Sequence, residues 1–212
     1  MSEIVKVENV TKYFKQEKVL DDVNMNLETG HIYGIVGKNG AGKTVLFKII
    51  AGFIKPSSGK VTVAGKIIGV DRDFPDNLGL IIETPGFLSQ YNAYQNLLYL
   101  ANINNKISKE DIKEAIRMVG LDPDSNKKVG KFSLGMRQRL GIAQAIMENP
   151  NLIILDEPMN GLDKKGIEDV KELLLKLKGD GKTILMASHY AEDMEICDEV
   201  FQMEDGKLGD MK

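Results

Sequence analysis

Several features that would tie a chain to a membrane or to an oxidising compartment are missing from this sequence. Its 212 residues include a single cysteine, Cys197, so no internal disulfide can form, which fits a reducing compartment. No apolar run exceeds six residues even with glycine counted, whereas a helix that spans a bilayer needs about 20. Residues 1–6 lack the apolar stretch of a signal peptide. We therefore expect a soluble, cytosolic domain that contacts a membrane only through a partner.

An excess of one charge is missing as well. The chain has 28 Lys and Arg against 31 Asp and Glu, for a formal net charge of -3. This balance argues against a generally basic nucleic-acid binder, so we expect no nucleic acid among the partners. No internal repeat, low-complexity segment or long linker divides the sequence. The chain is long enough to bury one full core, and we expect a single domain over residues 1–212.

What the chain does contain is an alternation of apolar strands with helical segments. The first 30 residues are expected to form short strands and turns. Further strands are expected at 31–36, 60–68 (interrupted by Gly65), 78–82, 152–155 and 183–187. Helices are expected at 45–51, 92–103, 108–120, 133–147 and 167–179. This order predicts an α/β fold with a mostly parallel sheet, in which a core of residues 1–84 and 150–212 holds a helical insertion at 85–149.

A glycine-rich loop between an expected strand and an expected helix matches the pattern G-x-x-x-x-G-K-[ST] in full, at residues 37–44. Backbone N–H groups of such a loop, together with the helix dipole, bind the β- and γ-phosphates of a nucleotide. Lys43 adds a positive charge at the transferring phosphate, and the Thr44 hydroxyl is a hard oxygen ligand for Mg²⁺. The alternative is a turn that merely joins strand to helix. The predicted ATP-binding residues here are Gly37, Asn39, Gly40, Ala41, Gly42, Lys43, Thr44 and Val45.

Two acids, Asp156 and Glu157, follow the apolar strand at 152–155. In open α/β sheets the carboxyl ends of the strands are where ligands bind. We expect Asp156 to hold Mg²⁺, through water, and Glu157 to polarise the water that attacks the γ-phosphate. The alternative is two solvated acids that begin a loop, helped by Pro158.

Further motifs resemble those of one family. The segment Phe132–Arg139, here called the signature segment, resembles the L-S-G-G-Q signature of ATP-binding cassette (ABC) ATPases. Asn160–Asp163 resembles the D-loop of that family, and Ser188-His189 its switch histidine. Lys12-Tyr13-Phe14 stands where the family places an aromatic residue that stacks on adenine. The order and spacing of these motifs match from about residue 4 to residue 207.

The resemblance implies a P-loop NTPase fold: a RecA-like, mostly parallel sheet with an N-terminal antiparallel β subdomain and an inserted helical subdomain. It also implies an ATP-hydrolysing subunit that dimerises around two ATP molecules and drives a separate membrane permease from the inner face of the membrane. A groove beside residues 83–91 would receive a cytoplasmic helix of that permease. Whether the two ATPase subunits are identical stays open, with a homodimer expected.

The resemblance also assigns roles to residues outside the phosphate loop. Ser133 and Gly135 of one subunit would close on the nucleotide of the other, with Asp163 at the dimer interface. His189 would contact the γ-phosphate. Each has a plainer reading: Ser133 and Asp163 as helix N-caps, and His189 as a satisfied residue at a strand end.

Adenine stacking is expected at Phe14, which fits the K-x-aromatic spacing from Lys12, with Tyr13 as the reserve choice. The plainer reading here is an aromatic ring at a strand end that packs on the core.

The chain departs from the family pattern at three positions. Leu134 replaces the first glycine of the signature and Met136 replaces its glutamine. Because leucine is no substitute for glycine at positive φ, we expect Leu134 to be helical or extended. Glu83 replaces the usual Q-loop glutamine, and it is expected to ligate Mg²⁺. Together these departures resemble bacterial exporter ATPases of the bacitracin and lantibiotic type.

Two other functions fit the sequence less well. A soluble ABC ATPase that acts on the ribosome or DNA usually has two cassettes or a long coiled-coil insertion, which 212 residues do not hold. A P-loop kinase for a small molecule is disfavoured by Glu157 beside Asp156, by the signature segment and by Asp163.

Overall fold

The computed structural model describes residues 2–83 and 85–210, and it contains two sheets. The smaller sheet has the order β2-β1-β4-β5 and is antiparallel, with β1 at Glu3–Phe14, β2 at Glu17–Glu28, β4 at Ser58–Val63 and β5 at Lys66–Ile67. Alternating apolar residues such as Val5 and Val7 are buried, which is the pattern of a sheet with one covered face.

Two details of this sheet correct the sequence prediction. The first 30 residues form two strands of 12 residues each, not short strands and turns. Register shifts around Asn9, which has a φ of 51°, break the alternation that would have marked one long strand. The predicted strand at 60–68 is a hairpin, because Ala64 and Gly65 both have positive φ and reverse the chain between β4 and β5.

The larger sheet has the order β10-β9-β3-β8-β7-β6. Its parallel members are β3 (Ile32–Val36), β6 (Leu78–Ile81), β7 (Leu152–Asp156), β8 (Thr183–Ser188) and β9 (Glu199–Glu204). β10 (Lys207–Asp210) pairs antiparallel with β9. β7 and β8 are buried throughout, as expected for strands covered on both faces. The carboxyl ends of β3, β7 and β8 therefore meet at one edge, which is where the predicted motifs lie.

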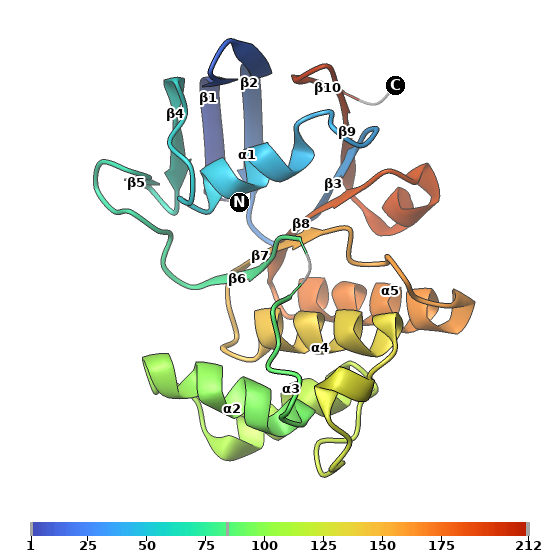
Figure 1. Cartoon of the computed structure of the whole chain (residues 1–212). Coiled ribbons are helices and arrows are strands. Elements are labelled where there is room, and N and C mark those ends of the chain that lie inside the picture. Colours follow the sequence, from blue (N-terminus) through green and yellow to red (C-terminus); the bar gives the residue numbers. More distant parts are fainter. Residues whose placement is uncertain (1, 84, 211–212) are drawn as a thin grey trace.

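Helices cover the larger sheet on both faces (Figure 1). α1 (Lys43–Ile50) lies between this sheet and the smaller one, and its apolar side joins one of two buried cores. α5 (Lys164–Gly179) and α4 (Leu134–Ile146) pack on the other face, where the second core lies. A 3₁₀ segment, η2 (Ala191–Ile196), follows β8.

The chain between the neighbouring strands β6 and β7 is mainly helical. It contains α2 (Ala93–Asn104), α3 (Lys109–Met118), the short η1 (Val129–Lys131) and α4. Capping boxes begin α2 at Asn92 and α3 at Ser108. The division into a core and an insertion at 85–149 stays a prediction, and residue 84, where it falls, lies outside the described residues.

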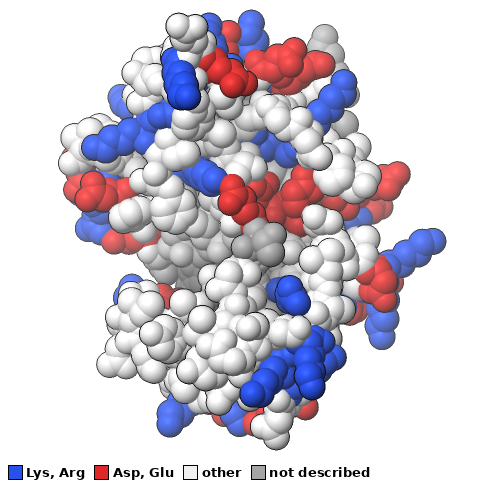
Figure 2. Space-filling view, viewed as in Figure 1, with Lys and Arg blue, Asp and Glu red and all other residues white. Residues whose placement is uncertain are grey.

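The sequence prediction of the remaining elements is largely confirmed. The five expected helices all form, although α1 begins at Lys43 rather than Val45. β9, β10 and η2 were not predicted. Figure 2 shows acidic and basic side chains interspersed on the visible face. Among the described residues, no helix has both the length and the apolar content needed to cross a membrane.

Candidate active site

The loop between β3 and α1 has a shape that only glycine permits at two positions. Gly42, the N-cap of α1, has a φ of 110°, and a Cβ there would lie 2.8 Å from Leu20 Cδ2. A Cβ on Gly37 would overlap the backbone carbonyl of Met203. Close approach to β9 therefore holds the loop in place, and the N-terminus of α1 faces the space that the loop encloses.

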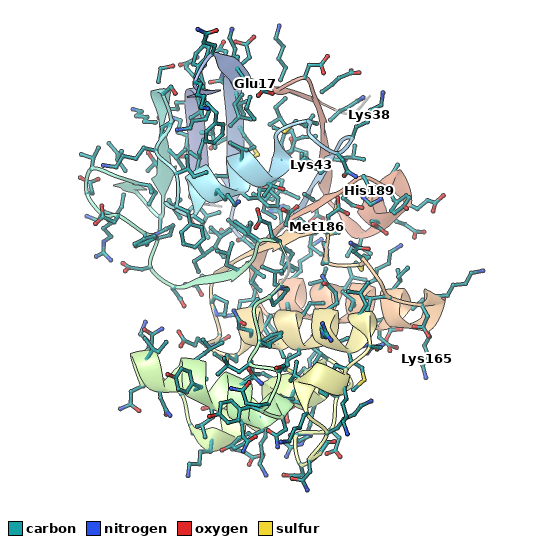
Figure 3. The ribbon with its side chains drawn as sticks, viewed as in Figure 1. Glu17, Lys38, Lys43, Lys165, Met186 and His189 are labelled. Atoms are coloured by element: carbon teal, nitrogen blue, oxygen red, sulfur yellow. The ribbon has the colours of Figure 1, made fainter. Side chains whose placement is uncertain are left out.

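Lys43 occupies the centre of this loop. Its side chain is 5% exposed, and its Nζ donates to the carbonyl oxygens of Gly37 at 2.5 Å and Lys38 at 3.2 Å. The same Nζ lies 3.8 Å from Glu157 Oε1. Figure 3 shows Lys43 and His189 on the same side of the molecule, near the carboxyl ends of β3 and β8. A buried positive charge thus stands where an anion on the loop would bind.

Thr44 and Asp156, which are 112 residues apart in sequence, are in direct contact. The Thr44 hydroxyl donates to Asp156 Oδ2 at 2.6 Å. Asp156 is buried, and its Oδ1 has no hydrogen-bond partner among the described residues. Burial raises the pKa of this carboxyl, the hydrogen bond from Thr44 lowers it in part, and the charge of Glu157 raises it further. The charge of the nearby Lys43 lowers this pKa in part, and the carboxyl end of the sheet therefore holds a buried carboxylate oxygen that accepts no hydrogen bond from the described residues.

Glu157 links this group to His189. Its Oε2 lies 2.9 Å from His189 Nδ1, and the imidazole ring lies against Tyr190 with centroids 3.9 Å apart. The backbone of Glu157 has a φ of 52°, which is uncommon for a residue other than glycine. Gln138 Nε2 donates to the Glu157 carbonyl at 3.0 Å. His189 is thus a strand-end histidine whose partner is the candidate catalytic carboxylate.

Glu83 lies at the end of β6, but its partner is a residue the sequence did not single out. Its carboxylate accepts a hydrogen bond from Lys48 Nζ at 2.5 Å, and its side chain is 65% exposed. Its negative charge is among the causes that raise the pKa of Asp156. Lys48 stands one helical turn after Thr44 on α1, so Glu83 stays beside the site while its charge is balanced.

Tyr13 and Phe14 lie at the tip of the β1–β2 hairpin. Each is 43% exposed, so the reading of either ring as part of the core is wrong. Lys12 Nζ lies 5.0 Å from the centroid of the Phe14 ring, and Lys18 Nζ lies 5.8 Å from that of Tyr13. Both rings are available at the surface for stacking.

Ser133, Gly135 and Asp163 form a separate group at the N-termini of α4 and α5. The Ser133 hydroxyl accepts from the Met136 backbone N–H at 3.2 Å, and Asp163 accepts from the Gly166 N–H at 2.9 Å, so both are N-caps. A Cβ on Gly135 would lie 3.0 Å from the Gly161 carbonyl oxygen. Within residues 2–83 and 85–210, no hydrogen bond joins this group to the phosphate loop.

Leu134 is the first residue of α4 and is 57% exposed. The expectation that it is helical or extended is thereby confirmed. The signature segment therefore begins a regular helix despite the loss of its first glycine, and Leu134 covers Gly161 of the neighbouring loop.

Two hollows flank the phosphate loop. One, of about 260 Å³, is lined by the loop together with Val19, Asp156 and Glu157. The other, of about 470 Å³, is lined by the loop together with His189 and residues 202–205. Gln138, Lys48 and Tyr190 belong to the site and were not predicted, because each is defined by a contact across the fold rather than by a local motif.

Comparison with known proteins places this geometry among ATP-binding cassettes. A family model described as ABC transporter matches residues 20–160. The uncharacterized ABC transporter ATP-binding protein YybJ of Bacillus subtilis is 44% identical, over 97% of this chain and 94% of its own. The bacitracin transport ATP-binding protein BcrA of Bacillus licheniformis is 42% identical, over 98% of this chain and 69% of its own. The lantibiotic transport ATP-binding protein SrtF of Streptococcus pyogenes is 35% identical, over 97% and 89% respectively.

Solved structures agree. The dimeric post-hydrolysis structure of the ATP-binding cassette MJ0796, bound to ADP and Pi, is 26% identical and superposes with a TM-score of 0.88 over 99% of both chains. This likeness confirms the predicted fold class, a P-loop NTPase fold. The predicted resemblance to ATPases of the bacitracin and lantibiotic type is confirmed as well.

Proposed function

The chain belongs to the ABC transporter family of ATP-binding proteins and is an ATPase, and we propose that it supplies energy to a separate membrane permease. The names of BcrA and SrtF, which refer to bacitracin transport and lantibiotic transport, support transport as the task, and we propose export as its direction. The proposed cargo is a peptide antibiotic, a drug or another small amphipathic molecule. The proposed location is the inner face of the membrane, reached through the permease.

The observation that supports this proposal most strongly is the separation of two groups of residues. The phosphate loop, Asp156, Glu157 and His189 converge on one edge of the sheet. Ser133 is the N-cap of α4 and lies outside this group, where the helix N-terminus presents backbone N–H groups and a positive dipole. Such a terminus suits a γ-phosphate, so we propose that it serves the nucleotide of a second copy in a head-to-tail dimer.

Within one half of that dimer, each side chain at the sheet edge takes a proposed role. Lys43 balances the charge of the β- and γ-phosphates. Glu157 accepts a proton from the attacking water. His189, whose Nδ1 lies 2.9 Å from Glu157 Oε2, orients the Glu157 carboxylate and contacts the γ-phosphate. The exposed ring of Phe14 stacks on adenine, with Tyr13 as the second choice.

The residues present also fit Mg²⁺. The unpartnered Asp156 Oδ1 and the Thr44 hydroxyl are hard oxygen donors in contact with each other. The described residues hold no cluster of three or more His, Cys, Asp or Glu, so phosphate oxygens and water would complete the coordination. Glu83 is the third proposed ligand. When bound, the ion would neutralise negative charge on the phosphates.

The permease is proposed to dock beside residues 83–91, where Leu88 and Tyr91 are each 39% exposed. The test is to purify the chain with its candidate permease from membranes and to measure phosphate release from MgATP. We expect the purified complex to release phosphate from MgATP and the chain to stay associated with the permease. A chain that hydrolyses ATP fully and never associates with a membrane protein would contradict the proposed role in transport.

A further inference from the structure

Gln138 reaches from the signature helix to the backbone of the proposed general base. It lies in the second turn of α4, and its half-buried side chain donates from Nε2 to the Glu157 carbonyl oxygen at 3.0 Å. The two residues are 19 positions apart, and the contact spans the junction between α4 and the end of β7. No motif quoted from the sequence assigns a role to this side chain.

The Glu157 backbone needs such support. A φ of 52° is costly for a residue with a Cβ, and it persists only where surrounding contacts hold it. Those contacts are the Glu157 N–H to the Ala187 carbonyl at 2.9 Å, the Asn160 N–H to the Glu157 carbonyl at 3.1 Å, and the Gln138 amide. Gln138 is the one side chain among these three, so it alone can be changed without altering the backbone.

The side chain of Glu157 points to the reacting groups while its carbonyl is held from α4. Its carboxylate lies 2.9 Å from His189 Nδ1 and 3.8 Å from Lys43 Nζ. A rotation about the Glu157 backbone would move that carboxylate, and misplacement of a general base lowers the rate without weakening nucleotide binding. Gln138 therefore acts on the reaction through Glu157.

We propose that Gln138 is a positioning residue that ties the orientation of Glu157 to the position of α4. The inference rests on the proposed function, in which the start of α4 closes on the nucleotide of the partner. One rigid helix then contacts both centres: Ser133 at its first turn serves the partner's nucleotide, and Gln138 in the next turn holds Glu157 beside its own. Closure of the dimer at one centre therefore changes the orientation of the Glu157 carboxylate at the other centre.

The test replaces Gln138 by methionine, which has a similar length and no donor. We expect Gln138→Met to lower kcat roughly tenfold, about 1.4 kcal/mol of activation free energy, and to leave the KM for MgATP within about twofold. Gln144→Met, at a half-buried position of the same helix beyond the signature segment, is the matched control and should keep the native kcat. Native turnover in Gln138→Met, or an equal loss of ATP affinity, would overturn the proposal.

A double-mutant cycle separates positioning from a general effect on the fold. In a Glu157→Gln background the base is already gone, so Gln138→Met should change the residual rate by less than about twofold. If Gln138→Met lowers the rate by the same factor in the native and the Glu157→Gln backgrounds, the inference is overturned. Gln138→Lys keeps a donor of similar reach and should retain kcat within about threefold of the native value. If that variant is as slow as Gln138→Met while both keep the native Tm, the hydrogen bond is not what matters.

The same data distinguish this inference from the proposed function. Native turnover in Glu157→Gln alone would remove Glu157 as the base and would defeat the proposed function together with the inference. Loss of turnover in Glu157→Gln, with native behaviour in Gln138→Met, would defeat only the inference.

Discussion

The phosphate loop and the start of the signature helix differ in how far they are completed within one chain. Around the loop, Lys43, Thr44, Asp156, Glu157 and His189 contact one another although they come from three separate segments. At the start of α4, the Ser133 hydroxyl caps its own helix, and in the part of the chain that the structure describes it has no hydrogen bond to that site. One region is assembled by folding, whereas the other, as we propose, presents its donors to a second molecule.

The largest effect should come from Glu157 in the assembled region. We expect Glu157→Gln to keep ATP binding and to lower turnover by roughly 10²-fold or more, because the base is removed while the loop stays intact. The variant should also accumulate as an ATP-bound dimer. Phosphate release and size-exclusion chromatography in ATP measure the two effects. Hydrolysis at the native rate would show that Glu157 is not the base.

Substitutions of Lys43 and Ser133 should have different effects if the two regions act in different steps of the reaction. Lys43→Ala is expected to weaken nucleotide binding to the monomer, because its ammonium stands where the phosphates would bind. Ser133→Ala should lower turnover about tenfold and impair dimerisation, with monomer affinity unchanged. Equilibrium binding of a fluorescent ATP analogue, read beside turnover, separates the two outcomes.

Ser108→Ala is the matched control for Ser133→Ala. It removes an N-cap from α3, whose loss costs the fold about 1 kcal/mol, as does that of Ser133. Equal losses of turnover in the two variants would mean that Ser133 acts only as a cap. A Ser133→Ala variant that loses monomer affinity and dimerisation together would also argue against a role across the dimer.

A smaller effect is expected from Lys48, which balances Glu83. Lys48→Gln leaves an unpaired carboxylate beside a multiply charged nucleotide, so the KM for MgATP should rise by roughly two- to fivefold, as suits an exposed ion pair. The double variant Lys48→Gln/Glu83→Gln restores the charge balance and should return the KM to its native value. A KM that stays raised in the double variant would show that Lys48 acts in another way.

The smallest effect concerns the stability of the nucleotide-free protein. Burial raises the pKa of Asp156, so this group favours folding below its unfolded pKa, and that contribution is lost as pH rises through the folded pKa. Asp156→Asn should therefore raise the unfolding free energy at pH 7 relative to the native chain, and the difference should shrink toward pH 4. Urea unfolding at several pH values measures it.

Asp198 is the control of opposite sign. Burial alone would raise its pKa, but hydrogen bonds from Lys178 and the Ile32 N–H outweigh burial and lower it. Its contribution is present above the unfolded pKa and is lost as pH falls through the folded pKa. Asp198→Asn should therefore destabilise the chain at pH 7. If Asp156→Asn and Asp198→Asn change the unfolding free energy at pH 7 in the same direction, this account of Asp156 is contradicted.

The sequence predicts the assembled region well because its parts are local motifs at strand ends. The phosphate loop and the pair Asp156-Glu157 follow β3 and β7, and parallel strands bring their carboxyl ends together. The ion pair of Glu83 with Lys48 joins residues 35 positions apart, and the Gln138 contact spans 19. Spacing alone does not reveal such contacts, since they depend on how α1 and α4 pack.

There are also physical reasons why some elements are not predicted from the sequence. β10 is an edge strand and β9 is its neighbour, and both are short with charged residues among the apolar ones, so their pattern resembles a surface loop. Asn9 interrupts the alternation of β1, so the sequence predicts short strands there instead of one long strand. The sequence predicts only an interruption at Gly65 within one strand, whereas positive φ at both Ala64 and Gly65 reverses the chain.

Mixing two inactive variants tests whether each reaction centre is shared between two molecules. Lys43→Ala supplies an intact signature, and Ser133→Arg supplies an intact phosphate loop. An equal mixture should recover roughly a quarter of native turnover, because half of the pairs are mixed and each holds one complete centre. No recovery, under conditions where mixed pairs are shown to form, would contradict the account.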